Sequence, residues 1–303
     1  MAPSTDTTPL VDHIVILVPH SFLSAPPSWF SEAFQFHPGG RHADGRTENS
    51  LVYLPDGAYL EFIAFLPGLD PADRATHHWG SKKEGTVIDW AVTLPATAED
   101  DAEREREKAG TSSGGELRLE KLFREVQRKV REQNTGIVYS DLRRGGRTRP
   151  DGEVLKWSTA FAKREDDAPL ELGTLPFWCL DVTPRHLRVP FETPGNAKHP
   201  SGVVGVAKVE VHPEPPKTAE SAKGVYDALF EGKQTDGEWK LSSLAGEKVH
   251  SGGVVSLGAS DGPTRIDITF FTDDESWVGK SVGGKIDGEN TLTFHLVAAS
   301  KDK

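Results

Sequence analysis

The sequence predicts an α+β protein in which the order strand, helix, strand, strand, strand is repeated. Two observations support this prediction. Runs rich in β-branched residues end at a nearby proline, and each is followed by a segment whose apolar residues recur at helical spacing. The pattern begins three times, near residues 12, 86 and 202. Internal recurrence of this kind indicates a modular architecture, so we expect repeated βαβββ modules.

The first round begins with the run 12–18, which is apolar enough for a strand with little exposure on either face. Residues 28–36 follow and predict a short helix that starts at a serine and carries several aromatic residues. Residues 50–54 and 59–65 have the composition of strands, and the Pro-Asp-Gly sequence between them suits a tight turn.

The second round begins with the run 86–94, which also ends at a proline. A charged helix is expected over residues 98–109, and a second helix over 116–133, where apolar residues fall on one face. The charged residues of that second helix are expected to form a solvated face rather than a binding patch. Three strands complete the round, near residue 142 and over 154–161 and 177–182.

The third round begins with a strand over 202–211 and continues with a helix over 218–230. Strands near residues 239 and 254 and over 266–271 follow. Residues 10–200 are therefore expected to hold two βαβββ modules, and residues 201–300 a third. The third round either packs outside the first two or pairs with a second chain, so a homodimer is one expected arrangement.

The charge balance limits the classes of partner. The 303 residues include 35 Lys and Arg against 46 Asp and Glu, for a formal net charge of −11. Such a field repels nucleic-acid phosphates and anionic lipid headgroups. We therefore expect a small-molecule substrate and neither a nucleic acid nor a membrane as partner.

Cysteine count and segment composition indicate the compartment. A single cysteine, Cys179, excludes an intramolecular disulfide and a four-cysteine zinc site. No run approaches the roughly 18 to 20 apolar residues that a membrane-spanning helix needs. The start of the chain lacks the basic and apolar regions of a secretory signal. A soluble, cytoplasmic protein is expected.

Several common catalytic motifs are missing from the sequence. It contains neither a dinucleotide-binding Gly-x-Gly-x-x-Gly after a strand nor a Gly-x-x-x-x-Gly-Lys-Ser/Thr phosphate loop. It also lacks a Gly-x-Ser-x-Gly nucleophile elbow and a His-Glu-x-x-His zinc helix. Cys179 lies in an apolar strand and is expected to be inert.

His13 and Glu61 form the most specific pair of candidate site residues. They lie on the first and last strands of one predicted round, so their side chains converge on one face if those strands pair. An imidazole nitrogen and a carboxylate oxygen are suitable ligands for a divalent cation. Two ligands are not a complete set, and each residue alone could be structural or face solvent.

Residues 39–49, which lie between them in sequence, are expected to form a polar loop. Its glycines let the backbone approach a ligand closely. His42 and Asn49 are predicted to contact substrate, although they could instead fix the segment itself.

Aromatic and basic residues supply further candidates for substrate binding. Trp90, Trp157 and Trp178 could line a pocket, or they could pack in the core as most buried tryptophans do. Arg188 lies in a segment bounded by prolines and could bind a substrate carboxylate, or its charge could be solvated.

Residues 12–18, 38–42, 47–49 and 59–64 resemble the glyoxalase-like branch of the vicinal oxygen chelate superfamily. Short segments that also resemble this family follow at intervals as far as residue 212. The resemblance implies paired βαβββ modules that form cupped mixed sheets around a divalent metal ion, which chelates neighbouring oxygens of a substrate or intermediate. The superfamily contains lyases, isomerases, oxygenases and metal-free binding proteins.

The resemblance assigns His13 as the metal ligand of the first strand and Glu61 as that of the last strand. The second module does not have the metal-ligand residues that the resemblance implies. If residues 89–90 are laid over 12–13, Trp90 falls at the histidine position, and Cys179 falls opposite Glu61. A metal ion would then need a further ligand, for which the candidates are His42, His186, His199 or a partner chain.

The third round also departs from the pattern. Ala207 falls at the histidine position there, and Asp267 is the residue that could match Glu61.

Two functions follow from the resemblance. The first is a metal-dependent lyase or isomerase that transforms a small oxygenated molecule, with Glu61 as catalytic residue and His13 and Glu61 as ligands. A second histidine beside them would instead match the ligand set of Fe(II) oxygenases. The alternative function is metal-free binding or sequestration of a small molecule. The sequence does not distinguish Zn, Fe, Mn, Ni and Mg.

Overall fold

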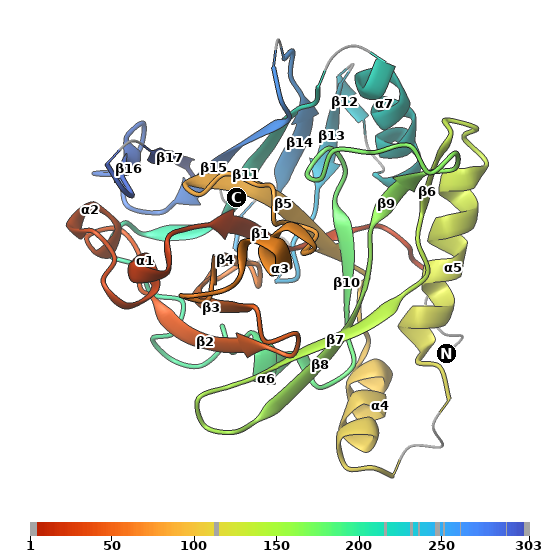
Figure 1. The fold of residues 1–303 in the computed structure, drawn as a ribbon, viewed down its shortest axis with the longest axis horizontal. Coiled ribbons are helices and arrows are strands. Elements are labelled where there is room, and N and C mark those ends of the chain that lie inside the picture. The colour runs from red at the N-terminus through yellow and green to blue at the C-terminus, as the bar shows by residue number, and fades with distance from the viewer. Residues whose placement is uncertain are drawn as a thin grey trace.

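The structure is a computed structural model that describes residues 5–111, 115–214, 217–230, 233–235, 237–245, 249–250, 252–260, 262–288 and 290–299. In this part of the chain, the strands form a closed eight-stranded barrel, an open seven-stranded sheet and a two-stranded ribbon. Helices lie outside the barrel, and the open sheet lies along one side of it (Figure 1). The predicted α+β class with cupped mixed sheets is confirmed.

The first module of the barrel follows the predicted order with two differences. Two short helices replace the expected single one, and residues His37–His42, which reach into the expected loop 39–49, form a strand. Its last three strands form an antiparallel meander, and its fourth strand returns to pair in parallel with its first. The elements are β1 (Leu10–Leu17), α1 (His20–Ser24), α2 (Ser28–Ser31), β2 (His37–His42), β3 (Thr47–Tyr53) and β4 (Tyr59–Phe65).

The second module repeats this arrangement after α3 (Pro71–Ala75). Both predicted helices are present, the first with a Thr97 and Asp100 capping box and the second with its apolar face on the barrel. The elements are β5 (Thr86–Thr93), α4 (Ala98–Lys108), α5 (Arg118–Arg131), β6 (Ile137–Tyr139), β7 (Arg143–Thr148), β8 (Val154–Ala160), β9 (Ala162–Arg164), β10 (Phe177–Asp181) and α6 (Arg185–Arg188).

The two modules join at two seams. β1 pairs antiparallel with β5, and β2 pairs antiparallel with β7, which closes the barrel. His13 pairs with Tyr59 in the parallel β1 and β4, and Ala91 pairs with Phe177 in the parallel β5 and β10. These matching registers relate each residue of the first module to a counterpart in the second.

The open sheet divides the predicted third round differently. β11, α7, β12, β13 and β14 form one module, and the expected strand 266–271 lies in β15, the first of three further strands on the other side of β11. The elements are β11 (Val203–His212), α7 (Lys217–Leu229), β12 (Lys233–Thr235), β13 (Glu238–Leu241), β14 (Gly253–Leu257), β15 (Arg265–Thr272), β16 (Ser281–Lys285) and β17 (Thr291–Ala298).

The order of strands in the open sheet repeats that of the barrel. The sheet order β12-β13-β14-β11-β15-β17-β16 corresponds, with the same parallel and antiparallel pairings, to β2-β3-β4-β1-β5-β10-β8. No described strand takes the place of β7, and the sheet stays open. The division of the chain near residue 200 stays a prediction.

The turn between β3 and β4 joins the barrel to the open sheet. Asp56 in this turn is completely buried and accepts hydrogen bonds from the backbone N–H groups of Ala58 and Val206. Its Oδ2 also lies 3.3 Å from Nε2 of His250. Gly205 is required beside it, since a Cβ at that position would lie 2.5 Å from both of these atoms.

We predict that Asp56→Asn lowers the free energy of unfolding by about 1–3 kcal/mol, because an amide cannot replace every acceptor contact of this buried carboxylate. Urea denaturation measures the change. Asp167→Asn is the control, since that side chain is 84% exposed, and we expect it to change stability by less than about 0.5 kcal/mol. Equal stabilities of the two variants would contradict the assigned role of Asp56.

Candidate active site

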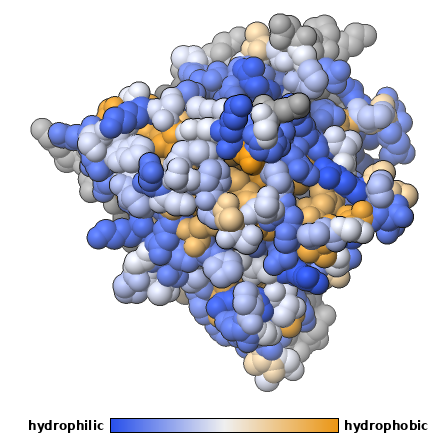
Figure 2. Space-filling model, turned by 60° about the vertical axis from the view of Figure 1, so that its left-hand side comes forward, coloured by the Kyte–Doolittle hydropathy of each residue, from blue (hydrophilic) through white to orange (hydrophobic). Residues whose placement is uncertain are grey.

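The barrel holds a cavity of about 680 Å³ that is lined by both modules. Its residues come from β1, β2, β3 and β4 of the first module, from β7, β8 and β10 of the second, and from the segment before β5. On the face of the molecule shown in Figure 2, the surface is mostly hydrophilic, with apolar side chains in patches near the middle. The cavity is therefore the main concave site to consider for a small molecule.

His13 and Glu61 face each other in this cavity. His13 Nε2 lies 3.5 Å from Glu61 Oε2, and the two residues are 3% and 5% exposed. The parallel pairing of β1 and β4 explains this position, because Glu61 follows the partner of His13 by two residues and so shares its face. The spatial proximity that the sequence predicted is present.

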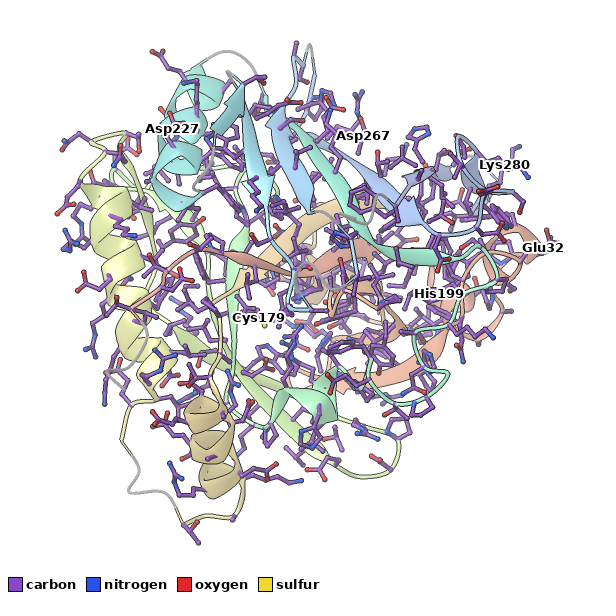
Figure 3. The ribbon with its side chains drawn as sticks, turned by 180° about the vertical axis from the view of Figure 1, so that it is seen from behind. Glu32, Cys179, His199, Asp227, Asp267 and Lys280 are labelled. Carbon is purple, nitrogen blue, oxygen red and sulfur yellow. The ribbon has the colours of Figure 1, made fainter. Side chains whose placement is uncertain are left out.

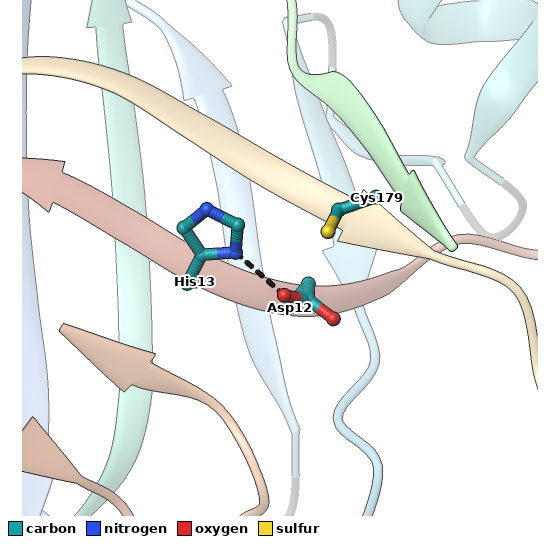
Figure 4. Close-up of side chains that lie close together, drawn as sticks. All are labelled: Asp12, His13 and Cys179. Atoms are coloured by element: carbon teal, nitrogen blue, oxygen red, sulfur yellow. Dashed lines mark hydrogen bonds and ion pairs between the residues drawn. The ribbon is translucent and has the colours of Figure 1, made fainter. Parts of the chain in front are cut away.

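Asp12 orients the imidazole of His13 from behind. Its Oδ1 lies 2.5 Å from His13 Nδ1, as the dashed line in Figure 4 shows. Burial would raise the pKa of Asp12, but the guanidinium groups of Arg185 and Arg188 hold it well below its ordinary value. An ionised Asp12 accepts a hydrogen bond from Nδ1–H, which leaves the lone pair of Nε2 directed toward the cavity.

Glu61 is held by two of the predicted substrate-binding residues. Asn49 Nδ2 donates to Glu61 Oε1 at 2.6 Å, and His42 Nε2 lies 3.3 Å from the same oxygen. Burial raises the pKa of Glu61, but His42, His13 and Asn49 together lower it to about 2. Glu61 is thus a carboxylate at neutral pH, and His42 and Asn49 fix its position.

The second module provides no equivalent pair. The strand registers place Ala91 at the counterpart of His13 and Cys179 at the counterpart of Glu61. The alignment of Trp90 with His13 is therefore wrong by one residue, and in a strand such a shift moves a side chain to the opposite face. Burial raises the pKa of the Cys179 thiol well above its ordinary value, so this group remains protonated.

Trp90 and Trp178 do not line the cavity. Trp90 lies outside the barrel, where it stacks on Tyr226 and Phe230. Trp178 packs against Phe123 of α5, also outside the barrel. Both were predicted to bind substrate, but the structure places them in core packing. Of the three tryptophans considered, Trp157 lines the cavity.

Arg188 reaches the cavity, but its hydrogen-bonding groups are committed to the protein. Its guanidinium makes four contacts of 2.6–3.0 Å with Asp12 and Asp181. It also donates to the hydroxyl of Tyr59 at 2.8 Å. These five hydrogen bonds equal the number of N–H donors of an arginine, so Arg188 has none left for a substrate carboxylate. Its place supports a positioning role rather than the predicted contact with substrate.

The other candidate ligands lie elsewhere. His199 is buried, where its ring accepts from the backbone N–H of Gln35 and bonds to the carbonyl of Tyr53. His186 is exposed on α6 and does not line the cavity. Of the three histidines considered as a further metal ligand, His42 is the one that lies beside Glu61.

Two further groups of possible ligands were identified among the described residues. Asp12, His13 and Cys179 present ligand atoms within 4.8 Å of one another, with the sulfur directed toward β1 (Figure 4). Asp12 is already engaged by two arginines and the thiol is protonated, so this trio is poorly suited to a metal ion. The second group, Glu210, His212 and Asp267, lies on the open sheet, apart from Cys179 in the barrel (Figure 3).

Asp267 is not a counterpart of Glu61. It lies on β15, whereas the last strand of its module is β14. It pairs there with His212 at 3.0 Å and with Arg265 at 3.0 Å.

The sequence prediction missed Arg147 and Trp79. Arg147 lies on β7 and lines the cavity, and Trp79 contributes from the segment before β5 together with His77 and His78. His77 Nε2 lies 3.4 Å from Asp44, another lining residue. Recognition of a strand over residues 143–148 would have placed Arg147 on the same face as Arg143, since strand side chains alternate.

The comparisons with known proteins agree with this architecture. A family model described as a glyoxalase-like domain matches residues 11–226, so the chain belongs to this family of the vicinal oxygen chelate superfamily. No helix in the described part of the chain is long and apolar enough to cross a bilayer.

A solved structure shows a similar fold. A hypothetical protein from Staphylococcus aureus is 12% identical with a TM-score of 0.58, and the match covers 95% of this chain and all of that one. A xylose isomerase-like TIM barrel/4-hydroxyphenylpyruvate dioxygenase fusion protein is also 12% identical, with a TM-score of 0.39, over 90% of this chain and 38% of that one. No curated protein matches the sequence.

We predict that Asp12→Asn lowers the free energy of unfolding by about 3–5 kcal/mol at pH 7, because two buried arginines lose a charged partner. The pKa of Asp12 is lower in the folded state than in the unfolded chain, where it is about 4. The contribution of the charged carboxylate to folding stability is therefore complete above about pH 4 and is lost as the pH falls below this value. The difference between wild type and variant should therefore shrink in acid. Urea denaturation at pH 7 and at about pH 3.5 tests this. A difference that is independent of pH would contradict it.

Proposed function

We propose that the chain is a metal-assisted enzyme, a lyase or isomerase, that transforms a small oxygenated molecule in the barrel cavity. The observation that supports this most directly is the approach of two imidazoles to one buried carboxylate. His13 and His42 place their Nε2 atoms 3.5 and 3.3 Å from the oxygens of Glu61. Nitrogen and oxygen donors in this combination suit zinc, iron, manganese or nickel.

The surroundings of the pair fit a divalent ion. Asp12 holds the far nitrogen of His13, which is the usual support of a metal-bound histidine. A separation of 3.5 Å between ligand atoms is compatible with an ion about 2.0–2.2 Å from each. His13 and Glu61 would hold the ion, with His42 as the third protein group nearby. Ala91 and Cys179 provide no hard ligand in the second module, which would leave positions open for water or substrate, as at catalytic sites.

The chemistry would be divided between the ion and the chain. A bound divalent cation would polarise a carbonyl or enolate oxygen of the substrate. Asp12 keeps His13 in one tautomer, and Asn49 and His42 keep Glu61 in place. Phe161 and Phe177 stack with their ring centroids 4.9 Å apart and give the cavity an apolar wall.

The difference between the two modules also supports a second function. Because Ala91 and Cys179 occupy the counterparts of His13 and Glu61, the cavity could bind a small molecule without a metal ion. A binding or sequestering protein is then the alternative. A cytoplasmic location and a homodimer, both expected from the sequence, stay predictions.

We predict that the purified protein, incubated with divalent metals and then dialysed, retains close to one metal ion per chain by elemental analysis. His13→Ala should reduce the metal to a small fraction of this amount, because a major ligand is lost. His186→Ala is the matched control, since that histidine is exposed outside the cavity. Absence of metal from the wild type, or full retention by His13→Ala, would contradict the proposal and favour the metal-free alternative.

A further inference from the structure

Arg147 is a buried cation that forms no ion pair among the described residues, and the carboxylate of Glu61 acts on it only from beyond ion-pair distance. It is 4% exposed on β7 and lines the cavity. Its Nη1 donates to the carbonyl of Gly39 in a short contact. No carboxylate of the described residues lies within ion-pair distance of it. Arg188 in the same cavity differs, because Asp12 and Asp181 both pair with it.

An unbalanced buried charge is energetically unfavourable. Removing a guanidinium from water costs free energy that a neutral carbonyl only partly recovers. Burial lowers the pKa of Arg147, but an arginine remains charged in proteins. A cation held in this state at a cavity wall is suited to bind an anionic group of a ligand.

The charge of the cavity lining supports the same inference. The chain carries a net charge of −11, but the lining contains six basic residues and two acidic ones. The basic residues are Arg46, Arg143, Arg144, Arg147, Lys163 and Arg188, and the acidic ones are Asp44 and Glu61. Basic residues therefore outnumber acidic ones among the residues that line the cavity, although the chain as a whole is acidic.

Most of these basic residues already have acidic partners. Arg46 pairs with Asp44, Arg144 with Glu120 and Lys163 with Asp167. Over the described part of the chain, no ion pair is recorded for Arg143 or Arg147. Both lie on β7, four residues apart on one face, with Arg147 buried and Arg143 at the exposed rim. The unbalanced charge is therefore concentrated on one strand.

The wall beside this strand is aromatic. A Cβ on Gly145 would lie 2.9 Å from Nε1 of Trp157, so the glycine lets the indole lie close against β7. Phe161 and Phe177 stack at 4.9 Å nearby in the same cavity. An apolar or aromatic group of a ligand would find matching surface here.

We propose that the cavity binds small carboxylic acids with an aromatic or apolar body. Arg147 holds the carboxylate, and Trp157, Phe161 and Phe177 contact the body. The planar fork of a guanidinium matches a carboxylate in geometry and charge. Such acids would be the substrate class of the proposed enzyme. The inference rests on the proposed function only because both place the small molecule in the same cavity. The role expected for Arg188 from the sequence is thereby assigned to Arg147.

Binding of matched acids and amides tests the proposal. The probes are benzoate, phenylacetate and 3-phenylpropionate, each compared with its neutral amide, and tryptophan fluorescence or NMR reports binding to full-length protein. At least one acid should bind the wild type about tenfold more tightly than its amide, because only the acid pairs with Arg147. Equal binding of acid and amide, or no binding of any acid at millimolar concentration, would overturn the proposal.

Substitutions of arginine test which positive charge binds the carboxylate. Arg147→Met should weaken acid binding about tenfold to a hundredfold and leave amide binding unchanged, and Arg147→Lys should restore part of the loss. Arg41→Met is the matched control, because that side chain on the adjacent β2 is 70% exposed and outside the cavity. Unchanged acid binding by Arg147→Met would overturn the proposal. If this variant does not fold, the comparison of acid with amide in the wild type still decides.

The measurements are made on chelator-treated protein and again on metal-loaded protein. Acid binding that depends on Arg147 without metal supports the carboxylate site even if the metal proposal fails. Metal retention with no preference for acids over amides would reject the carboxylate site and leave the proposed function intact.

Discussion

The cavity depends on one cluster of buried charges, in which Asp12 and Asp181 pair with Arg185 and Arg188. The cluster joins β1 of the first module to β10 and α6 of the second. Since Asp12 also bonds to His13, the ion pairs that fix Asp12 fix the imidazole too. Buried ion pairs contribute little net stability, but a broken pair is costly, so this arrangement restricts the barrel to one geometry around the site.

The two modules share a backbone plan but present different side chains to the cavity. The first contributes His13, His42 and Glu61, which are polar groups suited to a cation. The second contributes Arg147 and an aromatic wall, suited to an anion with an apolar body. Equivalent strand positions therefore differ in chemistry, since the uncharged Ala91 and Cys179 stand where the first module has His13 and Glu61. A metal ion on one side and a guanidinium on the other could bind two ends of one small acid, which would orient it for reaction.

Much of the fold followed from local patterns. β1 is buried along nearly its whole length, and the sequence showed this as an unbroken β-branched run. His13 and Glu61 were predictable because one module brings its first and last strands together. Arg147 was not, since its strand contains glycines and arginines in place of β-branched residues, and its pairing with β2 is long-range. Trp90 was misplaced because a strand register cannot be fixed to one residue from sequence.

The proposed chemistry depends on a divalent ion held by His13 and Glu61 in the cavity. The most direct measurement is a crystal structure of the metal-incubated protein with anomalous scattering recorded at the absorption edge of the metal. We predict one anomalous peak between His13 Nε2 and Glu61 Oε2, within about 2.0–2.2 Å of both atoms. A cavity without a peak, or a peak found only beside Glu210, His212 and Asp267 on the open sheet, would contradict it.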